Sequence, residues 1–342
     1  MSDLILGIES SCDETAAAVV EAGRNIRSSI VHSQVAEHAP FGGVVPEIAG
    51  RSHLEQIVPV IDRALAEAGV ALDDLGAIAV TQRPGLIGSL LVGLSTAKAL
   101  AWSRDLPLVG VDHIEAHLYA ATMEVAAIEF PCLGLVVSGG HTALYDLTSI
   151  TELRLIATTL DDAAGEAFDK VAHMLGLSYP GGPSVARLAD EGDPRAIAFP
   201  RYRSKGEPGF SFSGLKTAVL YHLRGQDALA RTPAPEDIPD RADVAASFQE
   251  AAVDALLHTT LEVARSGEYR TVLVSGGVAC NRRLREKTAL RADELGLRAV
   301  FPSPAYCTDN AVMIAGLGYH HLRAGRTLEL DADAYPHSAL AQ

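Results

Sequence analysis

The sequence has little of what marks the common special classes of protein. Only 21% of its 342 residues are charged and 48% are hydrophobic, which excludes a disordered chain or a coiled coil. Aromatic residues reach only 5%, with one Trp, so a stacking surface for single-stranded nucleic acid is not expected. The 28 basic residues are outnumbered by 43 acidic ones, and a net charge of −15 gives no overall attraction for a polyanion. Contact with nucleic acid therefore needs a local basic patch or a basic partner.

Cysteines and long apolar runs are also scarce. The four cysteines include no C-x-x-C pair, which argues against a disulfide framework or a cysteine zinc site and fits a reducing compartment. The apolar run at residues 4–8 is short, has no basic flank and meets Glu9, so it predicts a strand rather than a signal peptide. No stretch reaches the roughly 18 apolar residues that span a membrane. We therefore expect a cytoplasmic protein with no membrane contact.

Short apolar runs alternate with longer Ala- and Leu-rich stretches at helical spacing, which is typical of an α/β chain. The expected strands are 4–9, 77–81, 108–111, 133–138 and 271–275, and the expected helices are 53–68, 88–102, 163–175, 244–265 and 283–295. Residues 4–20 and 133–147 each run as a strand, a small polar turn and a second strand. Two such hairpins half a chain apart predict a duplicated architecture with a cleft between its halves.

Glycine-rich turns follow two of the expected strands. Gly139–Gly140 and Gly276–Gly277 each end a strand, and 179–183 offers a third such turn. Their backbone amides suit nucleotide phosphates or ribose, although each alone is equally well explained as a tight turn. Because the P-loop lysine and the G-x-G-x-x-G pattern are both absent, neither of those folds is expected. A nucleotide held between paired hairpins, as in the actin, hexokinase and Hsp70 architecture, remains available.

Two histidines, His113 and His117, lie four residues apart. On a helix they share one face, with Cβ atoms about 5–6 Å apart, which suits two imidazoles on one metal, although an incidental pair is the commoner outcome. A carboxylate from 308–311 is a candidate third ligand. The zincin protease motif H-E-x-x-H does not fit, because Glu115 lies two residues after His113, about 200° around the helix.

Several carboxylates lie at turns or helix starts. Asp161 and Asp162 are expected to cap the helix that follows them. Asp169, deeper in that helix, suits either a ribose hydroxyl or a surface salt bridge. Asp13 and Glu14 lie in the first hairpin turn, where a carboxylate facing the cleft could move protons, although most turn carboxylates are simply solvated.

Taken together, these segments resemble the TsaD family, the tRNA adenosine threonylcarbamoyltransferases, over nearly the whole chain and in the same order. The matching stretches are 7–15, 42–47, 84–88, 113–117, 137–141, 161–170, 179–183, 212–216, 275–281 and 308–310. The resemblance implies a duplicated actin-like (ASKHA) α/β fold, with two lobes around a central nucleotide and metal cleft. It implies an N-terminal lobe over 1–125, a C-terminal lobe over 126–318, and a segment 319–342 that packs back on the N-terminal lobe.

The resemblance also implies a reaction and its residues. One divalent metal per subunit, Fe²⁺ or alternatively Zn²⁺, would be bound by His113, His117 and Asp309. The substrate-binding residues would be Val136, Val137, Ser138, Gly139, Gly140, Asp169, Gly182 and Asn281. A threonylcarbamoyl group would pass from threonylcarbamoyl-AMP to the N6 amine of the adenosine 3′-adjacent to the anticodon, in tRNAs reading ANN codons. TsaB-like and TsaE-like proteins would be partners, and Asp13 is our candidate for the amine proton.

A tRNA substrate needs basic surface on this acidic chain. The clusters that could supply it, or could simply be solvated charge, are Arg201, Arg203, Lys205, Lys216, Arg282, Arg283, Arg285 and Lys287. Two alternatives remain: a small-molecule kinase on the same ASKHA fold, and a non-catalytic nucleotide-sensing module. The His/His/Asp set disfavours a kinase, because Mg²⁺ prefers oxygen ligands.

Overall fold

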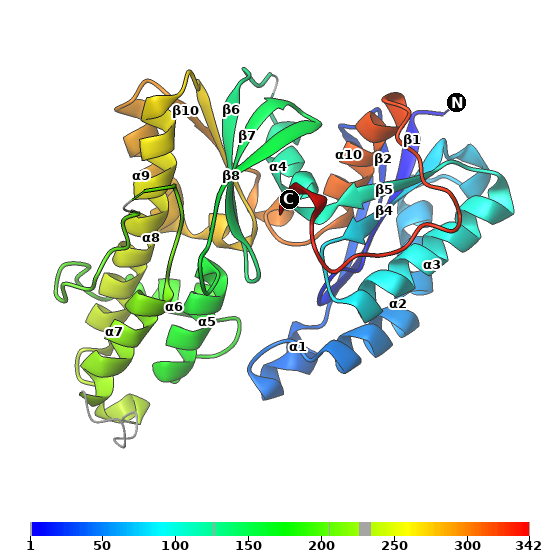
Figure 1. The fold of residues 1–342 in the computed structure, drawn as a ribbon. Coiled ribbons are helices and arrows are strands. Elements are labelled where there is room, and N and C mark those ends of the chain that lie inside the picture. Colours follow the sequence, from blue (N-terminus) through cyan, green and yellow to red (C-terminus); the bar gives the residue numbers. More distant parts are fainter. Residues whose placement is uncertain (1, 126, 205, 226–233, 342) are drawn as a thin grey trace. The chain divides into compact units, whose positions relative to one another are not determined.

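The computed structural model describes residues 2–125, 127–204, 206–225 and 234–341, and the chain divides into two compact units (Figure 1). The first unit comprises Met1–Ile128, Ile150–Leu153 and Pro302–Gln342, and the second comprises Glu129–Ser149 and Arg154–Phe301. The domain boundaries expected at residues 125 and 318 stay a prediction.

The first unit is built on a five-stranded sheet in the order β3-β2-β1-β4-β5. Its strands are β1 (Leu4–Glu9), β2 (Glu14–Glu21), β3 (Asn25–Ser33), β4 (Ala77–Arg83) and β5 (Leu108–Asp112). The central strand β1 runs antiparallel to β2 and parallel to β4, and β4 runs parallel to β5. The first expected hairpin is therefore confirmed.

Helices cover both faces of this sheet, and alternate residues of each strand face opposite helices. The short helix α1 (Val35–His38) precedes α2 (Pro46–Ala68), which with α3 (Ile87–Arg104) packs on the face that carries Leu6 and Ile8. On the opposite face, α4 (His113–Met123) and α10 (Ala311–Arg323) pack with Ile5 and Val20 (Figure 1). Both faces of the sheet are therefore buried.

Helix α10 lies unusually close to β1. A Cβ atom on Gly7 would lie 2.4 Å from the carbonyl oxygen of Ala311 and 2.6 Å from the amide nitrogen of Ala315. Only glycine leaves room for this approach. It sets the start of α10, and with it the loop that ends at Asn310, against the central strand.

The second unit repeats this sheet in the order β8-β7-β6-β9-β10. Its strands are β6 (Cys132–Val137), β7 (Thr142–Ser149), β8 (Glu152–Thr158), β9 (Thr271–Ser275) and β10 (Arg298–Val300). The central strand β6 runs antiparallel to β7 and parallel to β9, and β9 runs parallel to β10. Strand for strand, this is the pairing of the first unit, so the expected duplication is confirmed.

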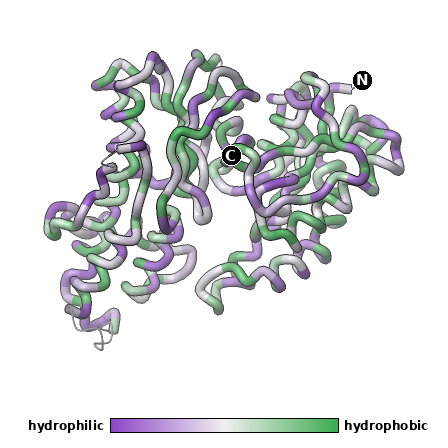
Figure 2. The backbone as a smooth tube through the Cα atoms, viewed as in Figure 1, coloured by the Kyte–Doolittle hydropathy of each residue, from purple (hydrophilic) through white to green (hydrophobic). Residues whose placement is uncertain are grey.

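Among the residues that the structure describes, the helices that accompany the second sheet are α5 (Ala164–Met174), α6 (Gly181–Ala189), α7 (Ser213–Arg224), α8 (Arg241–Ser266) and α9 (Arg282–Asp293). The long helix α8 contacts α6, α7, α9 and β6. Hydrophobic residues are frequent in strands β6 and β7, which are largely green in Figure 2. Within the described residues, no helix is long and apolar enough to cross a membrane, and all four cysteines are free.

Candidate metal centre and nucleotide-binding turns

Asp112 fixes the first turn of the helix that carries both histidines. Its Oδ1 accepts a hydrogen bond from the backbone nitrogen of Ile114 at 2.9 Å, which makes it the N-cap of α4. Its Oδ2 accepts a second one from Ser338 Oγ at 2.6 Å. Because β5 ends where α4 begins, His113 and His117 lie in the first turns of α4, at the carboxyl end of a parallel strand pair. Ligands of open α/β sheets bind at such ends.

The structure brings together the three expected metal ligands. Nε2 of His113 and Nε2 of His117 lie 3.3 Å and 3.2 Å from the same oxygen, Oδ1 of Asp309. Both imidazoles are buried, whereas the Asp309 side chain is 20% exposed. Asp309 directly precedes Asn310, which caps α10 by accepting from the amide of Met313 at 3.0 Å. The close packing of α10 on β1 thus places the carboxylate of Asp309 beside the two histidines.

Glu9, the last residue of β1, holds His113 from the other side. Its Oε2 accepts from His113 Nδ1 at 2.9 Å and from Thr81 Oγ1 at 2.6 Å, and its Oε1 accepts from the amide of Ser11 at 2.5 Å. With Nδ1 directed at Glu9, Nε2 is the nitrogen of His113 that faces Asp309 and would face a metal ion. This is the carboxylate–histidine arrangement that orients metal-binding imidazoles. Glu9 is not among the site residues expected from the sequence, because no local pattern links it to a histidine 104 residues away.

Burial disfavours the charged form of each of these groups, and pairing with an opposite charge overcomes it for Asp309 and His113 but not for His117. Burial alone would raise the pKa of Asp309, but the charge of His113 and the hydrogen bonds from His113 and His117 together hold it well below its usual value. Asp309 and Glu9 likewise outweigh burial and raise the pKa of His113 well above its usual value. Burial, together with the charge of His113, lowers the pKa of His117. The protein groups thus hold a positive charge between two carboxylates beside a neutral imidazole.

The chemistry of this donor set fits a divalent transition metal. Two imidazole nitrogens and one carboxylate oxygen, all within 4.8 Å of one another, form the set that Fe²⁺ and Zn²⁺ sites use. In the described part of the chain, Nδ1 of His117 is buried with no hydrogen-bond partner. The described residues therefore leave one ring nitrogen of His117 without a hydrogen bond. A possible metal-binding group is present.

Asp13 and Glu14 bring two more carboxylates to the same place, within 4.8 Å of Asp309. Burial and the neighbouring negative charges of Asp309 and Asp13 raise the pKa of Glu14 to about 10. Ser33 Oγ also donates to Glu14 at 3.1 Å. The expected catalytic residue Asp13 thus lies beside the three metal-ligand candidates, next to a carboxyl group whose pKa these surroundings raise.

Glu115 lies outside this cluster, as its spacing predicts. Its Oε1 is paired with Nε2 of His321 at 3.0 Å, and both side chains are buried. A metalloprotease of the zincin type needs this carboxylate beside the two histidines. The structure uses it instead to join α4 to α10.

In the second unit, two glycine turns meet at one edge of the sheet. Val136 of β6 pairs with Ser275 of β9 in parallel register, so the turns that follow these strands lie side by side. Gly276 has a φ of +94°, and a Cβ atom there would lie 2.4 Å from the carbonyl oxygen of Val137, so the position requires glycine. Gly139 and Gly140 have nothing within 4 Å of an added Cβ, which leaves their backbone open to a ligand. Val136 and Val137 are fully buried, so they can offer only backbone groups.

The remaining expected substrate residues lie on the helices behind these turns. Asp169 of α5 accepts a hydrogen bond from the amide of Gly181 at 2.7 Å and thereby holds the start of α6, where Gly182 is also found. Asn281 caps α9 by accepting from the amide of Leu284 at 3.0 Å, and its Nδ2 donates to Gln249 Oε1 at 2.7 Å. Asp169 and Asn281 therefore both have structural roles that the sequence does not reveal.

Solved structures with similar folds define the class of the protein. The chain is similar to T. kodakarensis HypF, with a TM-score of 0.62 and 16% identity over 94% of this chain and 48% of that one. It is also similar to component A of (R)-2-hydroxyglutaryl-CoA dehydratase from Acidaminococcus fermentans, with a TM-score of 0.57 and 14% identity over 94% and 100% of the two chains. At such identities the likeness shows the fold alone, which is the duplicated actin-like α/β fold expected from the sequence.

Sequence comparison is more specific. Residues 25–316 match the family model TsaD, described as tRNA N6-adenosine threonylcarbamoyltransferase. Proteins of that name from Symbiobacterium thermophilum and Geobacter sp. (strain M21) are 53% and 52% identical to this chain. The alignments cover 97% of this chain and 96% and 95% of those proteins. The chain belongs to the TsaD family, and it is a transferase that acts on tRNA. The kinase and nucleotide-sensing alternatives are not favoured.

Proposed function

We propose that this chain transfers the threonylcarbamoyl group of threonylcarbamoyl-AMP to the N6 amine of the adenosine 3′-adjacent to the anticodon, in tRNAs that read ANN codons. The observation that carries the proposal is the convergence of His113, His117 and Asp309 in a chain of this family. Because the substrate is tRNA, we propose the cytoplasm as the place of action.

His113, His117 and Asp309 would hold one divalent metal, Fe²⁺ in our proposal, with Zn²⁺ as the alternative. Nitrogen and carboxylate donors suit both ions. When bound, the metal supplies a Lewis acid that stabilises negative charge on the departing phosphate. Glu9 keeps His113 in the tautomer that presents Nε2.

The reaction itself is an acyl transfer. The adenine N6 nitrogen attacks the carbonyl carbon of the mixed anhydride, the bond from that carbon to the AMP phosphate oxygen breaks, and AMP leaves with the electron pair. The amine gives up a proton, and Asp13 is the proposed acceptor because its carboxylate lies beside Asp309. The anhydride supplies the driving force, so the protein needs chiefly to position both reactants.

The turns of the second unit would orient the AMP part. The open backbone at Gly139 and Gly140 suits close approach of phosphate or ribose, with Val136 and Val137 contributing backbone groups and Ser138 its hydroxyl. Asp169, Gly182 and Asn281, on α5, α6 and at the start of α9, complete the proposed nucleotide side.

Exposed apolar side chains lie on two neighbouring helices of the first unit. Leu54 and Val58 on α2 are 67% and 57% exposed, and Ile87 and Leu91 on the adjoining α3 are also exposed, each pair with helical i, i+4 spacing. Exposed apolar side chains grouped in this way mark interaction surfaces. We propose that a TsaB-like protein binds here, and that a TsaE-like protein joins the assembly.

The experiment is mass spectrometry of tRNA nucleosides after incubation with the chain, threonylcarbamoyl-AMP and the partner proteins. We expect threonylcarbamoyl-adenosine to form, and to be absent when the donor is omitted. A parallel reaction with Mg-ATP and small hydroxy compounds tests for kinase activity. Phosphorylated product without modified adenosine would contradict the proposal.

A further inference from the structure

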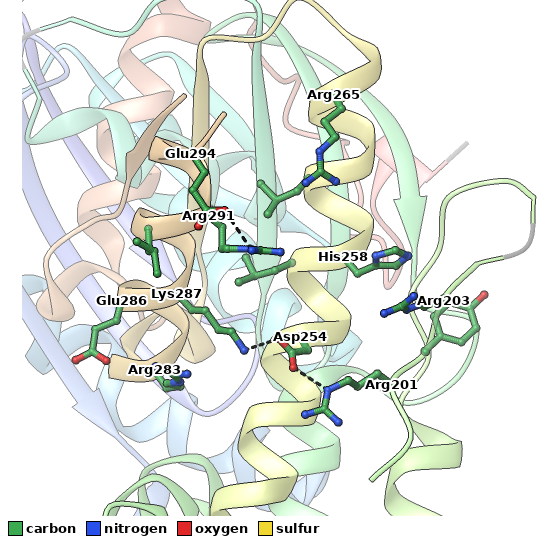
Figure 3. A pocket seen from close by; sticks show the side chains of 14 residues that line it. Arg201, Arg203, Asp254, His258, Arg265, Arg283, Glu286, Lys287, Arg291 and Glu294 are labelled. Carbon is green, nitrogen blue, oxygen red and sulfur yellow. Dashed lines mark hydrogen bonds and ion pairs between the residues drawn. The ribbon is translucent and has the colours of Figure 1, made fainter. Parts of the chain in front are cut away.

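A groove in the second unit gathers basic residues from three segments. Its volume is about 570 Å³, and it lies between α8, α9 and the chain near Arg201 (Figure 3). The basic residues that line it are Arg201, Arg203, Arg265, Arg283, Lys287 and Arg291. Leu257 and Leu261 of α8 and Leu290 of α9 add an apolar floor.

The lining is positive although the chain is acidic. Six basic and three acidic residues line it, the latter being Asp254, Glu286 and Glu294. With Glu250, which pairs with Arg283 and Lys287 beside the groove, the excess is two positive charges. The whole chain carries a net charge of −15. A polyanion approaching this protein therefore meets attraction only at such local patches.

Ion pairs neutralise the basic residues in the middle of the groove. Arg201 pairs with Asp254 at 2.7 Å, and Arg283 pairs with Glu250 at 2.7 Å. Lys287 pairs with both of these carboxylates. Most of the basic cluster expected from the sequence is thus used within the protein. Outside the groove, Lys216 pairs with Asp162 and Arg282 with Asp190, and Lys205 lies outside the described residues.

Two basic residues that line the groove have no ion-pair or hydrogen-bond partner among the described residues. In the described part of the chain, the side chains of Arg203 and Arg265 make no ion pair or hydrogen bond, and Figure 3 shows them at the groove with no interaction drawn to either. Both residues are exposed. His258 lies between them along the groove lining in Figure 3, but its Nε2 is paired with Glu262 at 3.4 Å.

We infer that this groove binds the phosphate backbone of tRNA, with Arg203 and Arg265 contacting phosphates. A single small phosphate is bound by buried donors that converge on one point, and here the central donors, Arg283 and Lys287, are already saturated by carboxylates. Free guanidinium groups on separate segments of an exposed groove suit a backbone whose charges are spread along its length. The inference rests on tRNA being the substrate of this family.

The test removes the two free charges without touching the ion pairs. The double variant Arg203→Gln/Arg265→Gln is compared with the control Arg195→Gln/Arg323→Gln, which removes the same charge from exposed residues that do not line the groove. Affinity for tRNA is measured between 50 and 200 mM salt for each protein, alone and with the partner proteins. KM for tRNA and KM for threonylcarbamoyl-AMP are measured in the transfer assay.

Each phosphate contact contributes about 0.7–0.9 to the slope of log affinity against log salt, so losing two contacts should flatten the slope by about 1.4–1.8. Raising the salt from 50 to 200 mM weakens the affinity of both proteins for tRNA. The factor by which affinity falls should be roughly tenfold smaller for the variant than for the parent. KM for tRNA should rise about tenfold at low salt while KM for the donor and kcat stay unchanged, and the control should match the parent.

A groove variant with the slope of the parent overturns the inference, as does a parent that binds no tRNA. Inorganic phosphate or ADP that binds the parent but not the variant, with the tRNA slope unchanged, also overturns it and assigns the groove to a small anion. The binding slopes need no turnover. A parent that binds tRNA with the expected slope but forms no modified adenosine would therefore contradict the proposed function and leave the groove assignment standing.

Discussion

Replacing Glu9 by Gln should detach His113 from the group that orients it while changing the side-chain volume little. The carboxylate accepts three hydrogen bonds, from His113, Thr81 and the amide of Ser11. A glutamine has one acceptor oxygen and one donor nitrogen. Whichever way the amide turns, its NH₂ group faces at least one of these donors, and a hydrogen bond is replaced by a donor–donor contact.

The substitution should lower both the folding stability and the metal affinity. A buried donor left without a partner costs about 1–3 kcal/mol of folding stability. Loss of the carboxylate behind a metal-binding histidine weakens metal affinity by about 10–100-fold. Glu9→Gln should therefore stay folded, with a lower free energy of unfolding, and bind Zn²⁺ or Fe²⁺ at least tenfold more weakly than the parent.

The assay is competition for metal against a chromophoric chelator, with urea denaturation of the same samples. Glu21→Gln serves as the control, because Glu21 is a partly exposed residue at the other end of the β1–β2 hairpin. Metal affinity within threefold of the parent, in a folded Glu9→Gln protein, would refute the reasoning that Glu9 orients a metal ligand.

Three further predictions test the remaining residues. Asp169→Ala should raise KM for threonylcarbamoyl-AMP more than it lowers kcat, because a ribose contact acts in the ground and transition states alike. The variant should also lose about 1 kcal/mol of folding stability, because the hydrogen bond from the amide of Gly181 is lost. An unchanged affinity for threonylcarbamoyl-AMP would leave Asp169 with a purely structural role. Asp13→Asn should slow single-turnover transfer by roughly 10²–10⁴-fold while sparing metal binding, and a rate within a few-fold of the parent would remove it from the mechanism. Glu250→Gln should destabilise the protein by about 1–2 kcal/mol at pH 7 after allowance for solvent screening, because the bond from Arg283 holds the pKa of Glu250 at about 2 despite burial.

The pH dependence of the last variant has a definite sign. A carboxyl group whose pKa is depressed on folding stabilises the protein above its unfolded pKa, near 4.5, and loses that contribution as the pH falls toward about 2. The stability difference between parent and Glu250→Gln, measured by urea denaturation, should therefore be constant from pH 7 to about 5 and should shrink below it. A difference that grows on acidification would contradict the ion-pair explanation.

The sequence predicts the elements whose pattern is local. Strands β1 and β9 begin and end where the apolar runs do, and both hairpins form with antiparallel pairing. Strand β3 was missed because Asn25–Ser33 is largely polar and lies at the sheet edge, where burial does not impose a clear alternation. Helix α2 begins at Pro46 rather than 53, because its first turns, around Gly50, carry few buried apolar residues.

Contacts between segments that are distant in the sequence could not be predicted from local patterns. Asp161 was expected to cap the helix that directly follows it, and this is wrong: α5 has no side-chain cap, and Asp161 accepts from the amides of Phe212 and Ser213 at the start of α7. The histidine spacing did predict a shared helical face, but the hydrogen bond from His113 to Glu9 depends on β1 and α4 folding together. Spacing along one helix is local, whereas the partner of a side chain across the sheet is set by tertiary packing.

The most direct test of the proposed metal centre measures metal content and transfer together in His117→Ala. In this cluster, His117 is paired with Asp309 and packs edge-on against the ring of His113. Ala is the best helix former, so α4 should persist. We expect purified His117→Ala to retain its fold but to lose both the bound metal and the formation of threonylcarbamoyl-adenosine in tRNA. The control His222→Ala, on the surface of α7, should keep both. A His117→Ala protein with parental metal content and normal tRNA modification would contradict the proposed metal centre.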